Sequence, residues 1–365
     1  MVNGQQPNIM KETMTMQKDI PALTDIRGAV YIPARAYNAY QMWRDYSDSE
    51  SRRDMGFAAS VNLNALRIWA SYDYWLEEPA GFKHKFDLLL DAASENGLRI
   101  MPSLFEDCGA DNSKEALTNR SPLTAVAVKS PGRAIEQDER LWDGPKRFIE
   151  WFFDIYKDDS RLLAIEIMNE PHLKAGNYKF AQAMLAHANQ RRGRIALTMG
   201  CMRLEHNLYF IDHGLDICQF HDNFPRSEQE FTALLEEAKS IELLTGRPVW
   251  LTEWQRIRRA GPGWDVKKLE RSEITPDLAS LAPIIREVGV GNFLWSLMVK
   301  PAYLQAQRPN GTFNGIFHED GSVYSLADAR AVSGNPAFQA EEKQEFPAWF
   351  AAESARYQNL AEEDA

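Results

Sequence analysis

The sequence lacks the features of a membrane protein and of a disulfide-stabilised domain. No stretch approaches the roughly 20 consecutive apolar residues that a membrane-spanning helix needs. The start, MVNGQQPNIMKETMTMQKDI, has neither the basic region nor the apolar region of a secretory signal. The cysteines are Cys108, Cys201 and Cys218, and they share no metal-type or CxxC spacing. We therefore expect reduced thiols, a cytoplasmic location and no membrane partner.

Positive charge is also scarce. The 365 residues include 41 Lys and Arg against 52 Asp and Glu, which gives a formal net charge of -11. Such a surface repels phosphate backbones and anionic lipids, so no nucleic-acid partner is expected. Hydrophobic residues make up 44% of the chain and charged residues 25%, an ordinary globular composition. A chain of this length forms either one α/β barrel or two smaller domains.

Eight apolar runs of strand length recur between two polar ends. They are nearly continuously apolar instead of alternating, which is typical of strands buried on both faces of a parallel sheet. The runs are RGAVYI from Arg27, NALRIW from Asn64, LRIMPSLF from Leu98, LLAIEIM from Leu162, RIALTM from Arg194, LDICQF from Leu215, PVWLTEW from Pro248 and GNFLWSLM from Gly291. We expect helices to separate these strands.

Helix signals lie between the runs. Five glycines stand just before strands, where glycine supplies the left-handed backbone that ends a helix: Gly97, Gly193, Gly214, Gly246 and Gly289. Ser227-Glu-Gln-Glu230 has the pattern of a capping box, and Thr275-Pro276 is typical of a helix start. An open doubly wound sheet would more usually have fewer strands and a GxGxxG turn after the first strand, which is missing.

The pattern therefore predicts an α/β fold, a single-domain (β/α)8 barrel of the TIM type. We assign residues 1–25 to an N-terminal extension and residues 26–335 to the barrel. Residues 336–365 are assigned to a C-terminal helical segment that packs on the barrel or trails from it. In such barrels the functional residues lie at the carboxyl ends of the strands.

Polar and aromatic side chains gather at these predicted strand ends. They are Arg67 and Trp69 on the second strand, Glu106 and Asp107 on the third, Asn169-Glu170-Pro171-His172 on the fourth, His221-Asp222-Asn223 on the sixth, Glu253-Trp254 on the seventh and Trp295 on the eighth. Glu170 follows AIEIM and Glu253 follows VWL. Carboxylates flanked by apolar residues are costly to bury, so both need partners or a function.

Glu170 and Glu253 are predicted to face each other across one barrel mouth. Cleavage of a glycosidic bond needs two carboxyl groups on either side of the anomeric carbon. We predict that Glu170 is the acid/base, with a pKa raised by the other carboxylate and by desolvation. Glu253 is predicted to be the nucleophile, kept ionised by Arg67, and Asn169 to donate to the sugar 2-hydroxyl. We expect neither a cofactor nor a metal.

The motif Asn169-Glu170-Pro171, with Glu253 in TEW three strands later, resembles the glycoside hydrolase barrels of clan A and, among them, family 5 of the cellulase superfamily. The resemblance runs from Arg27 to about Ala329. It implies a retaining β-glycoside hydrolase that acts by double displacement. Because a polymer-degrading enzyme would normally be exported and the sequence starts without a secretory signal, we expect small oligosaccharides or glycosides as substrates. It further implies that Arg67 supports the nucleophile, that His221 lies near the catalytic centre and that Trp295 forms a sugar platform.

Two positions depart from the family pattern. The family usually has His at the end of the third strand, where this chain reads Glu106-Asp107-Cys108, and Tyr at the position of Asn223. We therefore expect Glu106 or Asp107 to bind substrate hydroxyls. Further candidates for the binding site are Asn223, Trp69 and Trp254. The basic residues Arg256, Arg258 and Arg259 fit either an anionic sugar or a solvated loop.

Two other functions stay open. A metal-dependent barrel hydrolase would use His221 and His172 as its chief ligands, although no HxH occurs on the first strand. A carbohydrate-binding barrel without activity is the second alternative. The sequence does not determine the sugar, the choice between exo and endo cleavage, or the oligomeric state.

Overall fold

The computed structural model describes residues 23, 25–173, 176–257, 275–345, 348 and 352. Almost all of the predicted N-terminal extension lies outside these residues, as do Arg258, Arg259 and most of residues 336–365. Of the predicted C-terminal segment, residues 336–345 contain turns and a bridge from Glu342 to Val323, and the two further described residues, Ala348 and Ala352, are helical.

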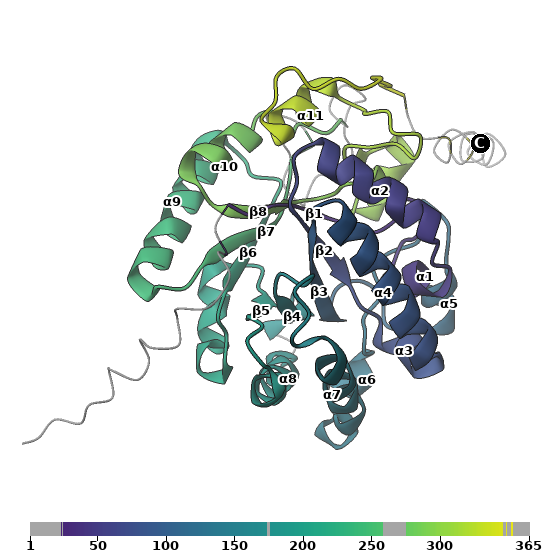
Figure 1. Ribbon diagram of the computed structural model, residues 1–365, viewed down its shortest axis with the longest axis vertical. Coiled ribbons are helices and arrows are strands. Elements are labelled where there is room, and N and C mark those ends of the chain that lie inside the picture. Colours follow the sequence, from purple (N-terminus) through teal and green to yellow (C-terminus); the bar gives the residue numbers. More distant parts are fainter. Residues whose placement is uncertain are drawn as a thin grey trace, which may run out of the picture.

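Eight parallel strands form one sheet that closes into a barrel (Figure 1). They are β1 (Arg27–Val30), β2 (Ala65–Trp69), β3 (Arg99–Glu106), β4 (Ile165–Asn169), β5 (Leu197–Gly200), β6 (Cys218–Asn223), β7 (Val249–Gln255) and β8 (Gly291–Leu294). Neighbours follow the order β5-β4-β3-β2-β1-β8-β7-β6. A parallel bridge between Thr198 and Ile217 joins β5 to the start of β6. The predicted (β/α)8 barrel is confirmed, and each of the eight apolar runs supplies one strand.

Helices lie around the outside of the barrel (Figure 1). They are α1 (Ala39–Arg44), α2 (Asp48–Ser60), α3 (Tyr72–Glu77), α4 (Pro79–Glu95), α5 (Lys114–Thr118), α6 (Arg133–Glu136), α7 (Asp143–Tyr156), α8 (Tyr178–Arg191), α9 (Glu228–Thr245), α10 (Ala282–Val288) and α11 (Leu326–Ser333). A short antiparallel pair, β9 (Lys300–Pro301) and β10 (Phe313–Asn314), follows β8. No helix among the described residues is both long enough and apolar enough to span a bilayer.

The connection between β5 and β6 is an exception to the expected alternation. It contains two 3-10 helices, Leu204–Tyr209 and Ile211–His213, in place of an α-helix. The buried side chain of Asn207 donates to the carbonyl of Gln219 at 2.7 Å and accepts from its N–H at 3.0 Å. Side-chain bonds of this kind compete with helix formation, and here they fasten the connection directly to β6.

The predicted helix ends are largely correct. Four glycines have positive φ, as expected: Gly97, Gly214, Gly246 and Gly289. Gly193 is different, because it is not among the positive-φ residues and a Cβ there would lie 2.6 Å from Asp158 Oδ1. Asp158 is an exposed side chain that can move aside, so nothing in the structure requires glycine at this position.

The helix starts were predicted with mixed success. Ser227 Oγ accepts from the N–H of Glu230 at 3.1 Å at the start of α9, so the capping box is confirmed. The helix expected at Thr275-Pro276 was placed wrongly, since α10 begins at Ala282 and has Pro283 in its first turn.

The two ends of the barrel differ in polarity. Apolar side chains pack at the amino-terminal end of the strands in one buried cluster, which consists of Ile26, Ala65, Met101, Leu163, Ala164, Ala196, Ile217, Trp250 and Phe293. The carboxyl ends instead carry buried charged groups, including Arg67, Glu106 and Glu253. Burial of apolar area stabilises the first end. The second end contains the groups that are able to react.

Candidate active site

Arg67 connects three of the strands at the polar end of the barrel. Its buried guanidinium donates from Nη1 to Glu253 Oε1 at 2.7 Å, and from Nε and Nη2 to the two oxygens of Glu166 at 2.8 and 2.6 Å. Nη2 also donates to Asn169 Oδ1 at 2.6 Å. A buried cation needs anionic partners of this kind, and the planar guanidinium can bind two carboxylates at once.

Glu166 was not singled out from the sequence. The signal was a charged residue within the buried run AIEIM, which requires an ionic partner inside the barrel. The backbone of β5 passes close to this pair. A Cβ on Gly200 would lie 2.8 Å from Glu166 Oε1 and 3.0 Å from Arg67 Nη2, so only glycine fits at this position without displacing the pair.

Glu253 is held by Arg67 on one oxygen and by a chain of amides on the other. Asn223 Nδ2 donates to Glu253 Oε2 at 3.2 Å. Gln255 Nε2 donates to Asn223 Oδ1 at 2.8 Å, and Asn314 Nδ2 donates to Gln255 Oε1 at 3.0 Å. The contact expected between Arg67 and Glu253 is present. Asn223, which stands where the family usually has Tyr, supplies a second hydrogen bond to the same carboxylate.

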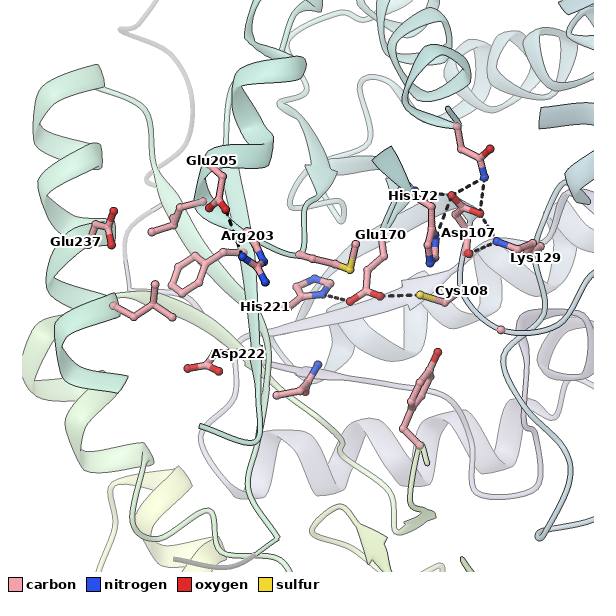
Figure 2. A pocket seen from close by; sticks show the side chains of 18 of the residues that line it. Asp107, Cys108, Lys129, Glu170, His172, Arg203, Glu205, His221, Asp222 and Glu237 are labelled. Carbon is pink, nitrogen blue, oxygen red and sulfur yellow. Dashed lines mark hydrogen bonds and ion pairs between the residues drawn. The ribbon is translucent and has the colours of Figure 1, made fainter. Parts of the chain in front are cut away.

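Glu170 follows the last residue of β4 and has a positive φ of 44°, which is uncommon for a residue other than glycine. Its carboxylate lies between His221 and Cys108 (Figure 2). His221 Nδ1 is 2.5 Å from Oε1, and Cys108 Sγ donates to Oε2 at 2.7 Å. One carboxylate oxygen of Glu170 and one of Glu253 lie within 4.8 Å of each other.

The Glu170–His221 pair is ionic. Burial raises the pKa of Glu170, but the hydrogen bond and the charge of His221 outweigh it, so this pKa is lowered. Burial lowers the pKa of His221, but the charge of Glu253 and the hydrogen bond of Glu170 outweigh that effect, so this pKa is raised. The expectation of a raised pKa for Glu170 is therefore wrong for the free protein. Both shifts favour an ionised Glu170 beside a protonated His221.

Glu106 and Asn169 form a third contact beside the two glutamates. Asn169 Nδ2 donates to Glu106 Oε1 and Oε2 at 2.9 and 3.1 Å, and the N–H of Cys108 donates to Oε1 at 2.7 Å. Burial raises the pKa of Glu106 well above its ordinary value, and the nearby charge of Glu170 adds to the effect. The Asn169 amide is thus fixed between Arg67 and Glu106.

Asp107 belongs to a separate buried network on the other side of Cys108 (Figure 2). Its carboxylate pairs with Lys129 and accepts from Asn177 Nδ2 at 2.9 Å and from the N–H of His172 at 2.6 Å. Burial raises the pKa of Asp107, but hydrogen bonds from His172 and Lys129 outweigh it and lower the pKa to about 2. Both oxygens of Asp107 are engaged by protein groups, although the residue lines a pocket.

Two of the three predicted tryptophans lie at the site. Trp69 and Trp295 form an edge-to-face pair with ring centroids 5.9 Å apart, and both line a cavity of about 40 Å³ together with Glu170 and Glu253. Buried Trp69 Nε1 has no hydrogen-bond partner in the described part of the chain. This N–H is therefore an unsatisfied donor in a residue that lines the same cavity as the two carboxylates.

The structure places Trp254 outside the site to which we assigned it from the sequence. Successive side chains of a strand point to opposite faces, so Trp254 points out of the barrel where Glu253 points in. Its Nε1 donates to Asn292 Oδ1 at 2.9 Å, and the ring lines a different cavity beside α10. This residue does not contribute to the site.

A larger pocket of about 730 Å³ opens on the far side of Glu170. It is lined by the connection after β5 and the end of β6, including Arg203, Glu205, His221 and Asp222 (Figure 2). Burial raises the pKa of Asp222 to about 6. Tyr303, which sequence analysis missed because a lone Tyr after β8 gives no signal, lines both this pocket and the 40 Å³ cavity.

Three potential metal ligands converge in the described residues, namely Glu170, His221 and Glu253. Arg67 occupies one oxygen of Glu253, and His221 Nδ1 is already bonded to Glu170. The second histidine considered for a metal site, His172, contacts Asp107 instead. The two histidines therefore do not converge on one centre.

No family model and no curated protein matches this sequence. Among solved structures, the fold is similar to an exo-β-1,4-mannosidase from Opitutaceae bacterium strain TAV5, with 17% identity and a TM-score of 0.58 over 90% of this chain. This chain spans 59% of the length of that protein.

Two further solved structures match over most of both chains. An endo-1,4-β-D-mannanase from Thermotoga petrophila RKU-1 matches at 14% identity with a TM-score of 0.54, over 85% of this chain and 98% of that one. A glycoside hydrolase family 5 mannosidase from Rhizomucor miehei matches at 12% identity with a TM-score of 0.55, over 92% and 94%. At these identities the likeness shows a shared fold. The chain is a (β/α)8 barrel of the form seen in these glycoside hydrolases.

Proposed function

We propose that this protein is a retaining β-glycoside hydrolase of the family 5 kind that acts on small oligosaccharides or glycosides. The observation that carries the proposal is the opposed pair Glu170 and Glu253, with carboxylate oxygens within 4.8 Å of each other. Retaining enzymes have carboxyl groups about 5–5.5 Å apart, whereas inverting enzymes need about 6.5–9.5 Å to admit a water. The short separation therefore supports retention.

In this proposal Glu253 is the nucleophile. The two hydrogen bonds from Arg67 and Asn223 stabilise its ionised form and fix its direction. The carboxylate attacks the anomeric carbon while the bond from that carbon to the leaving oxygen breaks, which forms a glycosyl ester on Glu253. Water then cleaves the ester and restores the carboxylate.

Glu170 is the acid/base, and His221 supplies its proton. In the free protein the two groups are 2.5 Å apart, and the directions of their pKa shifts favour the proton on His221. As negative charge develops on the leaving oxygen, the proton passes from Nδ1 of His221 to Glu170 and from Glu170 to that oxygen. In the second step Glu170 accepts a proton from the attacking water, and the pair returns to its initial state.

The surroundings of the two glutamates suit a sugar. Trp295 and Trp69 offer apolar ring surfaces beside the carboxylates. Trp69 Nε1 and His221 Nε2 are buried donors or acceptors without partners in the described residues, and sugar hydroxyls would satisfy both. Three solved structures of similar fold are named as mannosidases or mannanases, so β-mannosides are the first substrates to test. All three cysteines are free, which suits a reducing cytoplasm.

The test is a screen of aryl β-glycosides of mannose, glucose, galactose, xylose, arabinose and fucose, with Glu253→Ala as the control. We expect hydrolysis of at least one sugar by the wild type only, and NMR of the first product should show the β anomer. An α anomer as the first product would refute the retaining mechanism. Sugar binding without turnover on every glycoside and oligosaccharide would refute the enzymatic function and favour a carbohydrate-binding barrel.

A further inference from the structure

The spaces on the two sides of the catalytic pair differ greatly in size. The cavity beside Glu253 measures about 40 Å³ and continues into one of about 70 Å³, with which it shares Trp69, Trp295 and Tyr303. At about 10–15 Å³ for each water, the two together admit about 7–11 waters, which is room for about one sugar ring. The pocket beyond Glu170 measures about 730 Å³.

Three loops close the smaller side. The 70 Å³ cavity is bounded by residues 36–39 after β1, residues 125–128 after β3 and the segment 295–308 after β8. The last of these is fastened to the other two. Its Lys300 Nζ donates to the carbonyls of Pro33 and Ala34 at 2.5 and 3.2 Å, and also to that of Ala36.

A second buried cation fastens the same segment to the loop after β3. Arg308 donates from Nη1 to the carbonyl of Pro122 at 3.2 Å and to that of Ala125, and from Nε to Ala302 O at 2.6 Å. Gln305 Nε2 adds a bond to the carbonyl of Thr124 at 2.7 Å. Lys300 and Arg308 are 8% and 4% exposed, and within the described residues neither forms an ion pair.

Burial lowers the pKa of Lys300 to about 7 and that of Arg308 to about 10, which shows how completely both groups are removed from water. Lys300 and Arg308 donate to backbone carbonyls of these loops. Few of their donors are therefore left to bind a second sugar. We call residues 33–39, 122–128 and 295–308 the closing wall.

We propose that the closing wall makes the Glu253 side a blind pocket for one terminal glycosyl unit, so that the protein is an exo-acting glycosidase. The glycosyl unit that forms the ester must lie over Glu253, whereas the leaving group must lie beyond the acid Glu170. The first position lies in cavities of only about 40 and 70 Å³ bounded by the closing wall, whereas the second opens into the 730 Å³ pocket. This inference rests on the proposed function and adds the direction in which the substrate enters.

The experiment uses β-1,4-linked oligosaccharides of the sugar found in the glycoside screen, labelled at the reducing end. One set is free at the non-reducing end, and a matched set carries a 4,6-O-acetal on that terminal sugar. We expect the wild type to release single sugars from the free set, giving a ladder that shortens one unit at a time. The capped set should react about 100-fold more slowly, because the cap meets the closing wall.

Opening the wall provides a second measurement. Arg308→Met removes the two bonds from this side chain that fasten the segment to the loop after β3, and the capped-to-free rate ratio should rise about tenfold. Arg140→Met, at an exposed surface position, is the matched control and should leave the ratio unchanged. Circular dichroism verifies the folding of both variants. If Arg308→Met does not fold, the wild-type products still decide the question.

Hydrolysis of capped and free oligosaccharides at similar rates, or early release of disaccharides and trisaccharides, would overturn exo action and leave the glycosidase proposal intact. Inertness of the wild type toward both sets and toward every aryl glycoside would instead overturn the proposed function, and exo action with it.

Discussion

Glu253 and Glu170 differ in how the protein holds them, although both are glutamates at strand ends of one barrel. Glu253 is bound by a permanent cation, Arg67, and by the amide of Asn223. Glu170 is bound by His221, whose charge depends on pH, and by the thiol of Cys108. A fixed cation keeps a carboxylate ionised, whereas a titratable partner lets it gain and lose a proton. This difference is what the proposed function requires of a nucleophile at Glu253 and an acid/base at Glu170.

The strongest test of this difference removes the proposed nucleophile, Glu253. Glu253→Ala should lower kcat/KM on the order of 10⁴-fold or more, because no ester can form. Added azide should restore turnover and give a glycosyl azide of inverted configuration, since the anion attacks from the side that the carboxylate vacates. The measurement is the rate and the product configuration, by NMR. Rescue that yields the β-azide would contradict the role of Glu253.

Glu170→Ala should lower activity by about 10²–10⁴-fold on glycosides with poor leaving groups. A dinitrophenyl glycoside needs no acid in the first step, so its ester should form readily and accumulate as a burst. Pre-steady-state absorbance measures this burst. Equal losses on both kinds of leaving group, with no burst, would show that Glu170 is not the acid.

Arg67→Met should destabilise the fold by about 3–5 kcal/mol, because it leaves Glu166 and Glu253 buried without their cation. Urea denaturation followed by tryptophan fluorescence measures the change. Arg140→Met, which removes an exposed arginine, is the control. A stability of Arg67→Met equal to that of the wild type would show that Arg67 does not hold the two carboxylates together.

His221→Asn should move the alkaline limb of the kcat/KM profile to lower pH. In the wild type the last proton of the pair is held by His221, whose pKa is raised above 6.5. With Asn, that proton must be held by Glu170 alone, which loses it at lower pH than the pair does. The pH dependence of kcat/KM on one aryl glycoside measures the shift. An unmoved limb would mean that the two groups do not share the proton.

The smallest expected effect concerns Cys108. In the His221→Asn background the alkaline limb reports Glu170 alone, so Cys108→Ala should raise it by less than about one pH unit, because a donor to the ionised carboxylate is lost. Cys108→Ser keeps a donor and serves as the control. A limb that moves equally in the Ala and Ser variants would point to packing rather than hydrogen bonding.

Much of the barrel could be predicted from local sequence. Buried parallel strands need apolar residues on both faces, so eight such runs located all eight strands. The position of Glu170 and Glu253 at two strand ends placed them at one mouth. The absence of an α-helix between β5 and β6 could not be predicted. The side chain of Asn207 bonds there to Gln219 on β6, a strand that it meets only in the folded barrel.

Most members of the site could be predicted from the sequence, but apart from the pair Arg67 and Glu253 their contacts could not. The sequence places Asn223 at the end of the sixth strand, but its hydrogen bond to Glu253 depends on the distance between β6 and β7. Trp254 was assigned to the wrong face because a continuously apolar strand does not show which side chains point inward. The direction of the pKa shift of Glu170 was wrong for a similar reason, since the bond from His221 joins β6 to β4.

The sequence by itself determined the barrel and the presence of two glutamates at its mouth, because strand burial and strand ends are local patterns. Only the tertiary structure decided which groups hold each glutamate and how much space lies on each side. Those properties depend on side chains from different strands and on loops after β1, β3 and β8, whose approach is set by the closure of the barrel. Contacts of this kind produce no periodic pattern in the sequence.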